Sequence, residues 1–256
     1  MIESSLIDRS VRPETWLPFR RSVANRPLRL FCFPYAGAGA SIFGGWIRSF
    51  ENIDVFPVEL PARESRMHEA PIRDLQALVA AAATALWSFF GKPFALFGHS
   101  MGALICYELA AYLERLAGPR PLHVFVAAHA APQLRQDQEC WSTLPDSQLI
   151  ARITTDLGSP WAPPEFLRLM LPVLRSDLAL CENYTYSPVP PLRCGISAFG
   201  GLRDRSVAPS KIVPWQDRTR SSFTMRMVPG DHLFLRSAGA LLRQYISEDI
   251  ARVGCA

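Results

Sequence analysis

Short apolar runs alternate with segments of helical periodicity along most of the chain. Runs typical of buried strands occupy residues 28–33, 94–98, 122–128, 195–199 and 223–228. After the run at 94–98, apolar residues recur at helical spacing from Leu104 to Leu116, and Gly118-Pro119 then gives a helix stop signal. A strand, a helix and a strand in this order form a unit with two parallel strands. The pattern predicts an α/β protein with a mostly parallel central sheet flanked by helices.

Between the runs at 122–128 and 195–199 lies a long segment of a different kind. Residues 147–157 and 165–186 have helical periodicity, Pro172 lies inside the second of them, and proline-rich joints flank them. This pattern predicts a helical insertion that acts as a lid over the sheet. We therefore expect an N-terminal extension at 1–25, a core formed by 26–130 and 190–256, and a lid at 131–189.

The segment Gly98-His-Ser-Met-Gly102 stands where a predicted strand meets a predicted helix. A serine between two glycines at such a junction is typical of a nucleophile elbow, because glycine leaves room for the strained turn. Ser100 would then lie at the carboxyl edge of the sheet, where open α/β sheets bind ligands. The helix that begins at Met101 would direct free N–H groups and its positive dipole end to the same place. The pattern predicts that Ser100 is a nucleophile.

A nucleophilic serine needs a base, and in this architecture the acid and the histidine follow the serine in the chain. His232 lies on a loop after the strand-like run at 223–228, and Asp204 lies just past the run at 195–199. We expect Ser100 to attack an acyl carbon, His232 to take its proton, and Asp204 to orient the imidazole. Other acids that remain open as the third member are Asp177, Glu182 and Asp217.

A loop of small residues follows the first predicted strand at 28–33. Small residues let the backbone approach an acyl group, so the N–H groups of Ala36 and Met101 are predicted to form an oxyanion hole. The same loop partly resembles a dinucleotide-binding fingerprint through Gly37-x-Gly39. The third glycine of that fingerprint is replaced by Ile42, which argues against a dehydrogenase.

The composition excludes several other classes. A chain of 256 residues with 49% hydrophobic and 20% charged residues can bury one full core. No run of 18 apolar residues predicts a membrane span, and a net charge of +4 without a basic run interleaved with aromatics gives no sign of nucleic-acid binding. The cysteines and histidines show no metal-ligand spacing, so no metal or cofactor is expected. Unpatterned cysteines and the lack of a signal-peptide pattern favour the cytoplasm.

Several motifs together resemble the type II thioesterases, which are α/β-hydrolases that work beside polyketide synthases and nonribosomal peptide synthetases. These motifs are Phe33-Pro-Tyr-Ala-Gly37, Val58-Glu-Leu-Pro-Ala-Arg-Glu64, Gly98-His-Ser-Met-Gly-Ala103, the segment 200–207, and Gly230-Asp-His-Leu-Phe-Leu235. The resemblance extends from about Arg26 to Ile250. It implies the α/β-hydrolase fold and the roles of triad and oxyanion donors for Ser100, Asp204, His232, Ala36 and Met101.

The resemblance also implies a substrate and a partner. Members of the family hydrolyse stalled or wrong acyl groups from the phosphopantetheine arm of acyl or peptidyl carrier proteins during antibiotic biosynthesis, so small acyl thioesters are the expected substrates. This chain departs from the family at Gly37-Ala38, where two glycines are usual, at Ala62, where Pro-Gly-Arg is usual, and at Ala128-His129, where two arginines are frequent. The first two departures remove no catalytic atom, whereas the third leaves no arginine at 128–132 to make a contact there.

Residues expected to contact the acyl group are Tyr35, His99, Leu167, Met170 and Leu174. For the apolar residues of the lid, packing of the lid onto the core is an equal alternative. Two other functions also remain open at this stage. A general carboxylesterase or lipase-like hydrolase would use the same residues on oxygen esters, and a non-catalytic protein would use the pocket to bind an acyl chain or a carrier protein.

Overall fold

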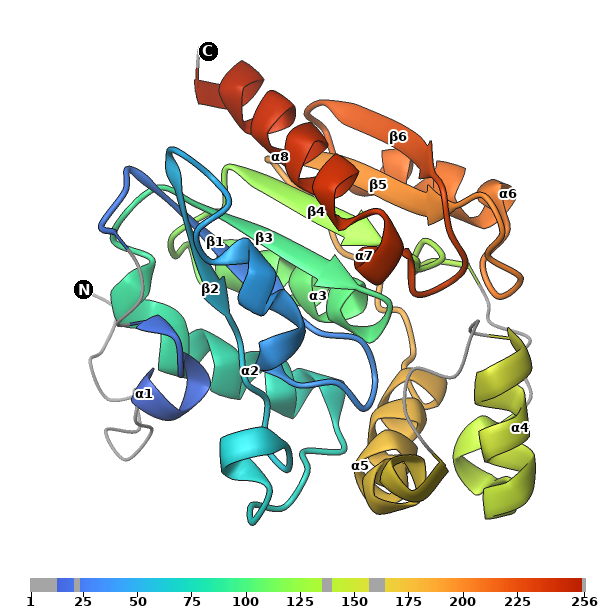
Figure 1. Cartoon of the computed structure of the whole chain (residues 1–256). Coiled ribbons are helices and arrows are strands. Elements are labelled where there is room, and N and C mark those ends of the chain that lie inside the picture. Colours follow the sequence, from blue (N-terminus) through green and yellow to red (C-terminus); the bar gives the residue numbers. More distant parts are fainter. Residues whose placement is uncertain (1–12, 21–23, 135–139, 157–163, 255–256) are drawn as a thin grey trace.

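A computed structural model describes residues 13–20, 24–134, 140–156 and 164–254 (Figure 1). Most of the predicted N-terminal extension lies outside the described residues, as do residues 135–139 and 157–163 of the predicted lid. Among the helices of the described residues, none combines the length and the apolar character needed to cross a membrane.

The described residues form a six-stranded sheet in the order β2-β1-β3-β4-β5-β6, and every neighbouring pair is parallel. The strands are β1 (Leu28–Phe33), β2 (Ile53–Pro57), β3 (Phe94–His99), β4 (His123–Ala127), β5 (Gly195–Gly201) and β6 (Phe223–Val228). The prediction of a mostly parallel sheet is confirmed. Phe33 pairs with Gly98, His99 with Ala127, and Ala127 with Phe199. The register therefore brings the carboxyl ends of β1, β3, β4 and β5 to one edge.

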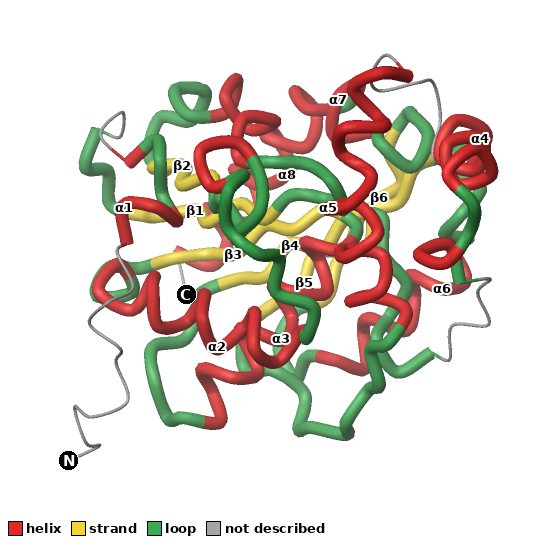
Figure 2. The backbone as a smooth tube through the Cα atoms, turned by 90° about the horizontal axis from the view of Figure 1, so that it is seen from below, coloured by secondary structure: helices red, strands yellow, loops and turns green. Residues whose placement is uncertain are grey.

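Helices cover both faces of the sheet, as Figure 2 shows from below. On one face lie α2 (Leu75–Leu86) and α3 (Met101–Arg115), and on the other lies α8 (Gly239–Gly254). The strands alternate between the two layers, so that Phe31 and Phe33 of β1 join the cluster of α2 and α3 while Leu30 and Cys32 join that of α8. Burial on both faces explains why the strands have continuous apolar runs.

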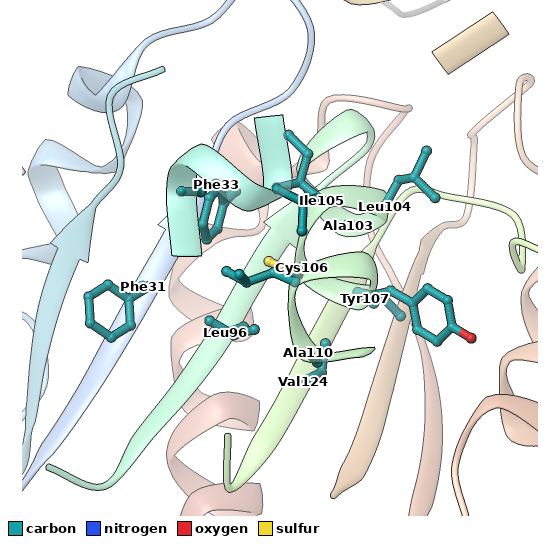
Figure 3. Packing of buried hydrophobic residues seen from close by; sticks show 14 of the residues in the cluster. Phe31, Phe33, Leu96, Ala103, Leu104, Ile105, Cys106, Tyr107, Ala110 and Val124 are labelled. Carbon is teal, nitrogen blue, oxygen red and sulfur yellow. The ribbon is translucent and has the colours of Figure 1, made fainter. Parts of the chain in front are cut away.

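Helix α3 packs directly beneath the middle of the sheet. Figure 3 shows Cys106 and Ala110 of α3 beside Leu96 of β3 and Val124 of β4, and all four belong to one buried cluster. Cys32 and Cys106 are fully buried and free of disulfides, as packing residues should be. This contact fixes the start of α3 relative to the end of β3, where the predicted nucleophile lies.

The two helices predicted between β4 and β5 are present. They are α4 (Asp146–Asp156) and α5 (Pro164–Glu182), and Pro172 lies inside α5. Both lie beyond the carboxyl edge of the sheet (Figure 1). They have a small apolar cluster of their own, separate from the two clusters of the sheet, made of Leu149, Ile153, Leu171 and Leu174.

Two elements of the sheet layer were not predicted. Strand β2 is short, and α2 has the sequence LQALVAAAATAL, whose many alanines give little contrast between its two faces. The remaining short helices are α1 (Pro13–Trp16), η2 (Ala40–Trp46), η3 (Glu64–Arg66), η4 (Trp87–Phe89), η5 (Trp141–Thr143), α6 (Pro209–Ile212), η6 (Val213–Arg218) and α7 (Phe234–Ser237). Within the predicted extension, Trp16 and Leu17 are buried in the core cluster of α2 and α3.

Candidate active site

Ser100 occupies a strained turn between β3 and α3, with φ +53° and ψ −118°. A Cβ atom on Gly98 would lie 2.0 Å from the carbonyl oxygen of Gly102, and one on Gly102 would lie 2.2 Å from that of Phe33. No side chain fits at either position. The N–H of Ser100 donates to the carbonyl of Ala127 on β4 over 2.7 Å. These contacts hold the backbone in a conformation that costs about 1–3 kcal/mol for a residue other than glycine.

Three predicted residues meet at the carboxyl edge. Nε2 of His232 lies 3.0 Å from Oγ of Ser100, and Nδ1 of His232 lies 2.9 Å from Oδ2 of Asp204. An ionised carboxylate can only accept, so Nδ1 of His232 carries the proton and donates it. Nε2 is then the acceptor for the Ser100 hydroxyl, which is the arrangement that a general base requires.

The carboxyl group of Asp204 is completely buried. Burial raises the pKa of this carboxyl group. The hydrogen bond and charge of His232, together with the backbone N–H groups of Ser206 and Val207, outweigh burial, so the pKa of Asp204 lies below its usual value. Those two N–H groups donate to Oδ1 over 2.8 and 3.1 Å, which leaves Oδ2 for the histidine. Asp204 is therefore held ionised and aimed at His232.

The loops that carry Asp204 and His232 are bonded to each other. The N–H of Leu202 donates to the carbonyl of Val228 over 2.9 Å, and that of Arg203 donates to the carbonyl of Gly230 over 2.8 Å. These bonds continue the pairing of β5 with β6 beyond the strand ends. The acid and the histidine, which are far apart in the chain, are thus fixed by neighbouring strands.

His99 lies behind the imidazole of His232 and has no exposed surface. Burial, and then the charge of His232, lower the pKa of His99 to about 3. The neutral ring must donate from Nε2 to the backbone carbonyl of His232, which lies 2.7 Å away. The structure thus gives His99 a contact that holds the loop of His232.

The other acids that the sequence left open lie elsewhere. Asp177 is paired with Arg63, and Glu182 accepts hydrogen bonds from the backbone N–H and the hydroxyl of Ser142. Asp217 is exposed in η6. Of these four acids, Asp204 is the one that the structure bonds to His232.

The predicted oxyanion loop forms a tight turn at the end of β1. The N–H of Ala38 donates to the carbonyl of Tyr35 over 3.0 Å, with Ala36 and Gly37 between them. Gly37 has φ +76°, which is the signature of the third residue of a type II turn. Because Phe33 pairs with Gly98, this turn adjoins the elbow, and Met101 follows Ser100 as the first residue of α3.

A family model described as the thioesterase domain matches residues 28–248 of the chain. The chain belongs to the thioesterase family. It is a hydrolase that acts on thioesters, and the resemblance stated from the motifs is confirmed.

Solved structures support the same conclusion. RedJ, a thioesterase from the prodiginine biosynthetic pathway in Streptomyces coelicolor, is 40% identical with a TM-score of 0.82, and the match covers 88% of this chain and 91% of RedJ. The type II thioesterase BorB from the borrelidin biosynthetic cluster is 31% identical with a TM-score of 0.85, and the match covers 91% of this chain and 97% of BorB. The α/β-hydrolase fold is thereby confirmed.

One relative is named for a different activity: the linear gramicidin dehydrogenase LgrE of Brevibacillus parabrevis. It is 38% identical over 234 residues, which cover 89% of each chain. That name describes an oxidoreductase, whereas the family model and the solved structures are those of thioesterases. In this chain the dinucleotide fingerprint is broken at Ile42, so the thioesterase assignment stands.

The residues expected to contact the acyl group differ in their surroundings. Tyr35 is buried, and its ring packs edge-on against that of His99 at 5.7 Å between centroids. Leu167 and Leu174 of α5 are buried, whereas Met170 is partly exposed. A Cβ atom on Gly37 would lie 3.2 Å from Cδ1 of Leu174, and Ala36 packs against the cluster that contains Leu174, so this side chain lies beside the predicted oxyanion loop.

Sequence reasoning missed a buried ion pair beside this loop. Asp177 of α5 binds Arg63 through two hydrogen bonds of 2.9 and 3.0 Å. Arg63 belongs to a motif of the family, and Asp177 was considered as a catalytic acid, but no spacing along the chain joins the two. Among the described residues, no group of three or more histidine, cysteine or acidic side chains could hold a metal ion.

Proposed function

We propose that this thioesterase hydrolyses acyl thioesters through a covalent acyl-enzyme on Ser100, with His232 as general base and acid and Asp204 as the residue that orients His232. The observation that carries the proposal is the continuous set of hydrogen bonds from Asp204 to His232 to Ser100, with the serine in a strained turn. Nucleophile, base and orienting acid in hydrogen-bond contact are the features that acyl transfer by serine requires.

The reaction proceeds in two halves. In the first, Oγ of Ser100 attacks the acyl carbon, its proton passes to Nε2 of His232, and the C–S bond breaks as that proton goes to the leaving thiol. In the second, His232 takes a proton from water, the hydroxide attacks the acyl-enzyme, and the proton returns to Oγ as the carboxylic acid leaves. The N–H groups of Ala36 and Met101 stabilise the oxyanion in both halves.

The proposed substrate is an acyl group on the phosphopantetheine arm of an acyl or peptidyl carrier protein in the cytoplasm. Hydrolysis there would clear stalled or aberrant acyl groups from a polyketide synthase or a nonribosomal peptide synthetase. The similarity to RedJ of the prodiginine pathway and BorB of the borrelidin cluster supports this assignment.

The proposed division of the chain is an extension at 1–25, a core of 26–130 and 190–256, and a lid at 131–189. The separate apolar cluster of α4 and α5 supports treating the lid as a unit. We assign the acyl contacts to Tyr35, Leu167, Met170 and Leu174, and we assign His99, which is fully buried and bonded to the carbonyl of His232, to holding the His232 loop instead. Support is strongest for Leu174, whose side chain lies against Gly37 of the oxyanion loop.

The test is hydrolysis of one acyl group presented on a carrier protein, on pantetheine and as a p-nitrophenyl ester. We expect the highest kcat/KM for the carrier-bound thioester, and a loss of about 10⁴-fold or more with Ser100→Ala on every substrate. Ser49→Ala is the matched control. It also removes a hydrogen-bonded serine hydroxyl, which donates to the carbonyl of Trp46, but Ser49 is not part of the set formed by Asp204, His232 and Ser100. That control should keep wild-type rates.

Three outcomes would count against the proposal. Equal or faster hydrolysis of the p-nitrophenyl ester would indicate a general carboxylesterase. Tight binding of the acyl carrier without turnover would indicate a binding protein. Full activity of the Ser100→Ala variant would remove the acyl-enzyme from the mechanism.

A further inference from the structure

A buried ion pair joins the lid helix α5 to the loop after β2. The side chains of Arg63 and Asp177 are 3% and 4% exposed, and each carboxylate oxygen of Asp177 accepts from one terminal nitrogen of Arg63. Such a pair gains little net stability, because the loss of hydration offsets most of the attraction between the charges. Its geometry, however, is fixed, because bidentate contact allows one relative orientation of the two groups.

Both charged groups also bind the oxyanion turn. Oδ2 of Asp177 accepts the N–H of Gly37 over 2.8 Å, and the guanidinium of Arg63 donates to the carbonyl of Ala38 over 3.3 Å. The bond to Gly37 fixes the plane of the peptide between Ala36 and Gly37. Because the N–H of Ala38 also closes the turn onto the carbonyl of Tyr35, the bonds at Gly37 and Ala38 anchor the whole turn that carries the N–H of Ala36.

The loop that supplies Arg63 is itself held rigidly. Ala62 and Glu64 both have positive φ, at +70° and +46°. The carboxylate of Glu64 accepts from the backbone N–H of Ser41, just beyond the oxyanion turn. It also occupies the space at Gly39, where a Cβ would lie 2.2 Å from its carboxyl carbon. The turn is thus held from one side by this loop and from the other by α5.

We infer that Arg63 and Asp177 are positioning residues for the oxyanion hole, which tie the turn that presents the N–H of Ala36 to the lid helix α5. This inference rests on the proposed function, because it takes Ala36 as an oxyanion donor. Neither side chain touches the reacting atoms; the pair acts through its bonds to the backbone of the turn at Gly37 and Ala38. A displacement of α5 from the sheet would take Asp177 with it and leave the N–H of Gly37 without its acceptor.

The decisive variant replaces the whole pair with apolar side chains of similar size, as Arg63→Met with Asp177→Leu. Apolar replacement of a buried ion pair commonly preserves or raises stability, so this variant should fold. It lacks the acceptor for the Gly37 N–H. We expect kcat on hexanoyl-pantetheine, per active site titrated, to fall by about 10²-fold, with KM changed by less than about threefold. The inhibition constant of a hexyl trifluoromethyl ketone, whose adduct carries an oxyanion, should rise by about the same 10²-fold factor.

Asp249→Asn is the matched control. Asp249 is as buried as Asp177 and binds Arg226 through two hydrogen bonds of 2.7 Å, but it lies on α8 away from the turn. This variant should lower Tm and keep kcat per active site. Wild-type kcat in a folded Arg63→Met/Asp177→Leu variant would overturn the inference, as would an equal fall of kcat in Asp249→Asn. The Ser100→Ala variant separates the two proposals, since its full activity would instead overturn the proposed function.

Discussion

At the scale of single residues, the site combines a strained serine with an oriented imidazole. Ser100 holds its positive φ because both flanking glycines pass too close to the backbone to bear a Cβ. His232 is fixed on two sides, since Asp204 accepts from its ring and His99 donates to its backbone carbonyl. The hydroxyl and the ring nitrogen are therefore placed before any substrate arrives.

Replacing Asp204 by asparagine tests the orienting role. The amide would present an N–H to Nδ1 of His232, which would leave the proton on Nε2 and make Nε2 useless as a base. We expect kcat on an acyl-pantetheine thioester to fall by about 10³–10⁴-fold with little change in KM. Steady-state kinetics of the folded variant measure both. A loss of less than tenfold would show that the orienting acid is another residue.

At this scale the sequence predicts a meeting of side chains wherever residues lie on loops that follow neighbouring strands. The structure brings Ser100, Asp204 and His232 into hydrogen-bond contact, because strand ends in a parallel sheet share one edge. The contact of His99 with the carbonyl of His232 and the pairing of Arg63 with Asp177 were not found. Such contacts depend on how loops and lid helices fold back onto the sheet, and the sequence carries no periodic signal for that.

At the scale of elements, strain gathers in turns and at the starts of helices rather than inside helices or strands. The loop from Pro61 to Glu64 contains two non-glycine residues with positive φ. One of them is Ala62, at the position where the resemblance to the type II thioesterases would place glycine. Alanine is less stable than glycine in this left-handed conformation, so the loop loses some stability at Ala62.

We predict that Ala62→Gly stabilises the protein. An alanine in the left-handed region costs about 1–2 kcal/mol relative to glycine, while the greater freedom of glycine in the unfolded chain costs about 0.4–1 kcal/mol. The net gain should be about 0.5–1 kcal/mol in the free energy of unfolding, measured by urea denaturation. The matched control is Ala80→Gly inside α2, which should lose about 1 kcal/mol. A loss of stability in Ala62→Gly would contradict the argument from backbone strain.

Elements whose apolar pattern and flanking turn residues are clear in the sequence were predicted more accurately than elements that lack them. Strands β1 and β6 were predicted with the bounds that the structure has, because each is followed directly by a proline, Pro34 or Pro229. Helix α2 was missed, since half of its residues are alanine, and β2 was missed because Asp54 and Pro57 interrupt its apolar run. Helix α2 packs against α3 and β2 pairs with β1, so tertiary contacts rather than local pattern define them.

At the scale of the whole molecule, burial of neutral histidines links stability to pH. Burial is the main cause that lowers the pKa of His99 to about 3 and those of His123 and His129 to about 4. In the unfolded chain these groups have the ordinary value of 6.5. Between pH 6.5 and 4 the unfolded state therefore binds more protons, and stability falls as the pH falls.

We predict a steep acid limb in the stability curve. Each such histidine contributes about 1.4 kcal/mol per pH unit within this window. The free energy of unfolding from urea titrations should therefore fall by more than about 1.4 kcal/mol per unit between pH 6.5 and 5, which means that more than one extra proton is taken up. A flat profile over this range would show that these histidines are protonated in the folded protein.

The central claim is that thioester hydrolysis passes through the hydroxyl of Ser100. The most direct test is to label the wild-type protein with a fluorophosphonate, locate the adduct by peptide mass mapping, and follow hydrolysis of a carrier-bound acyl thioester on the same samples. We predict one adduct per chain on Ser100, with activity falling in proportion and reaching zero at complete labelling. Thioester hydrolysis that persists in protein fully labelled at Ser100 would contradict the account.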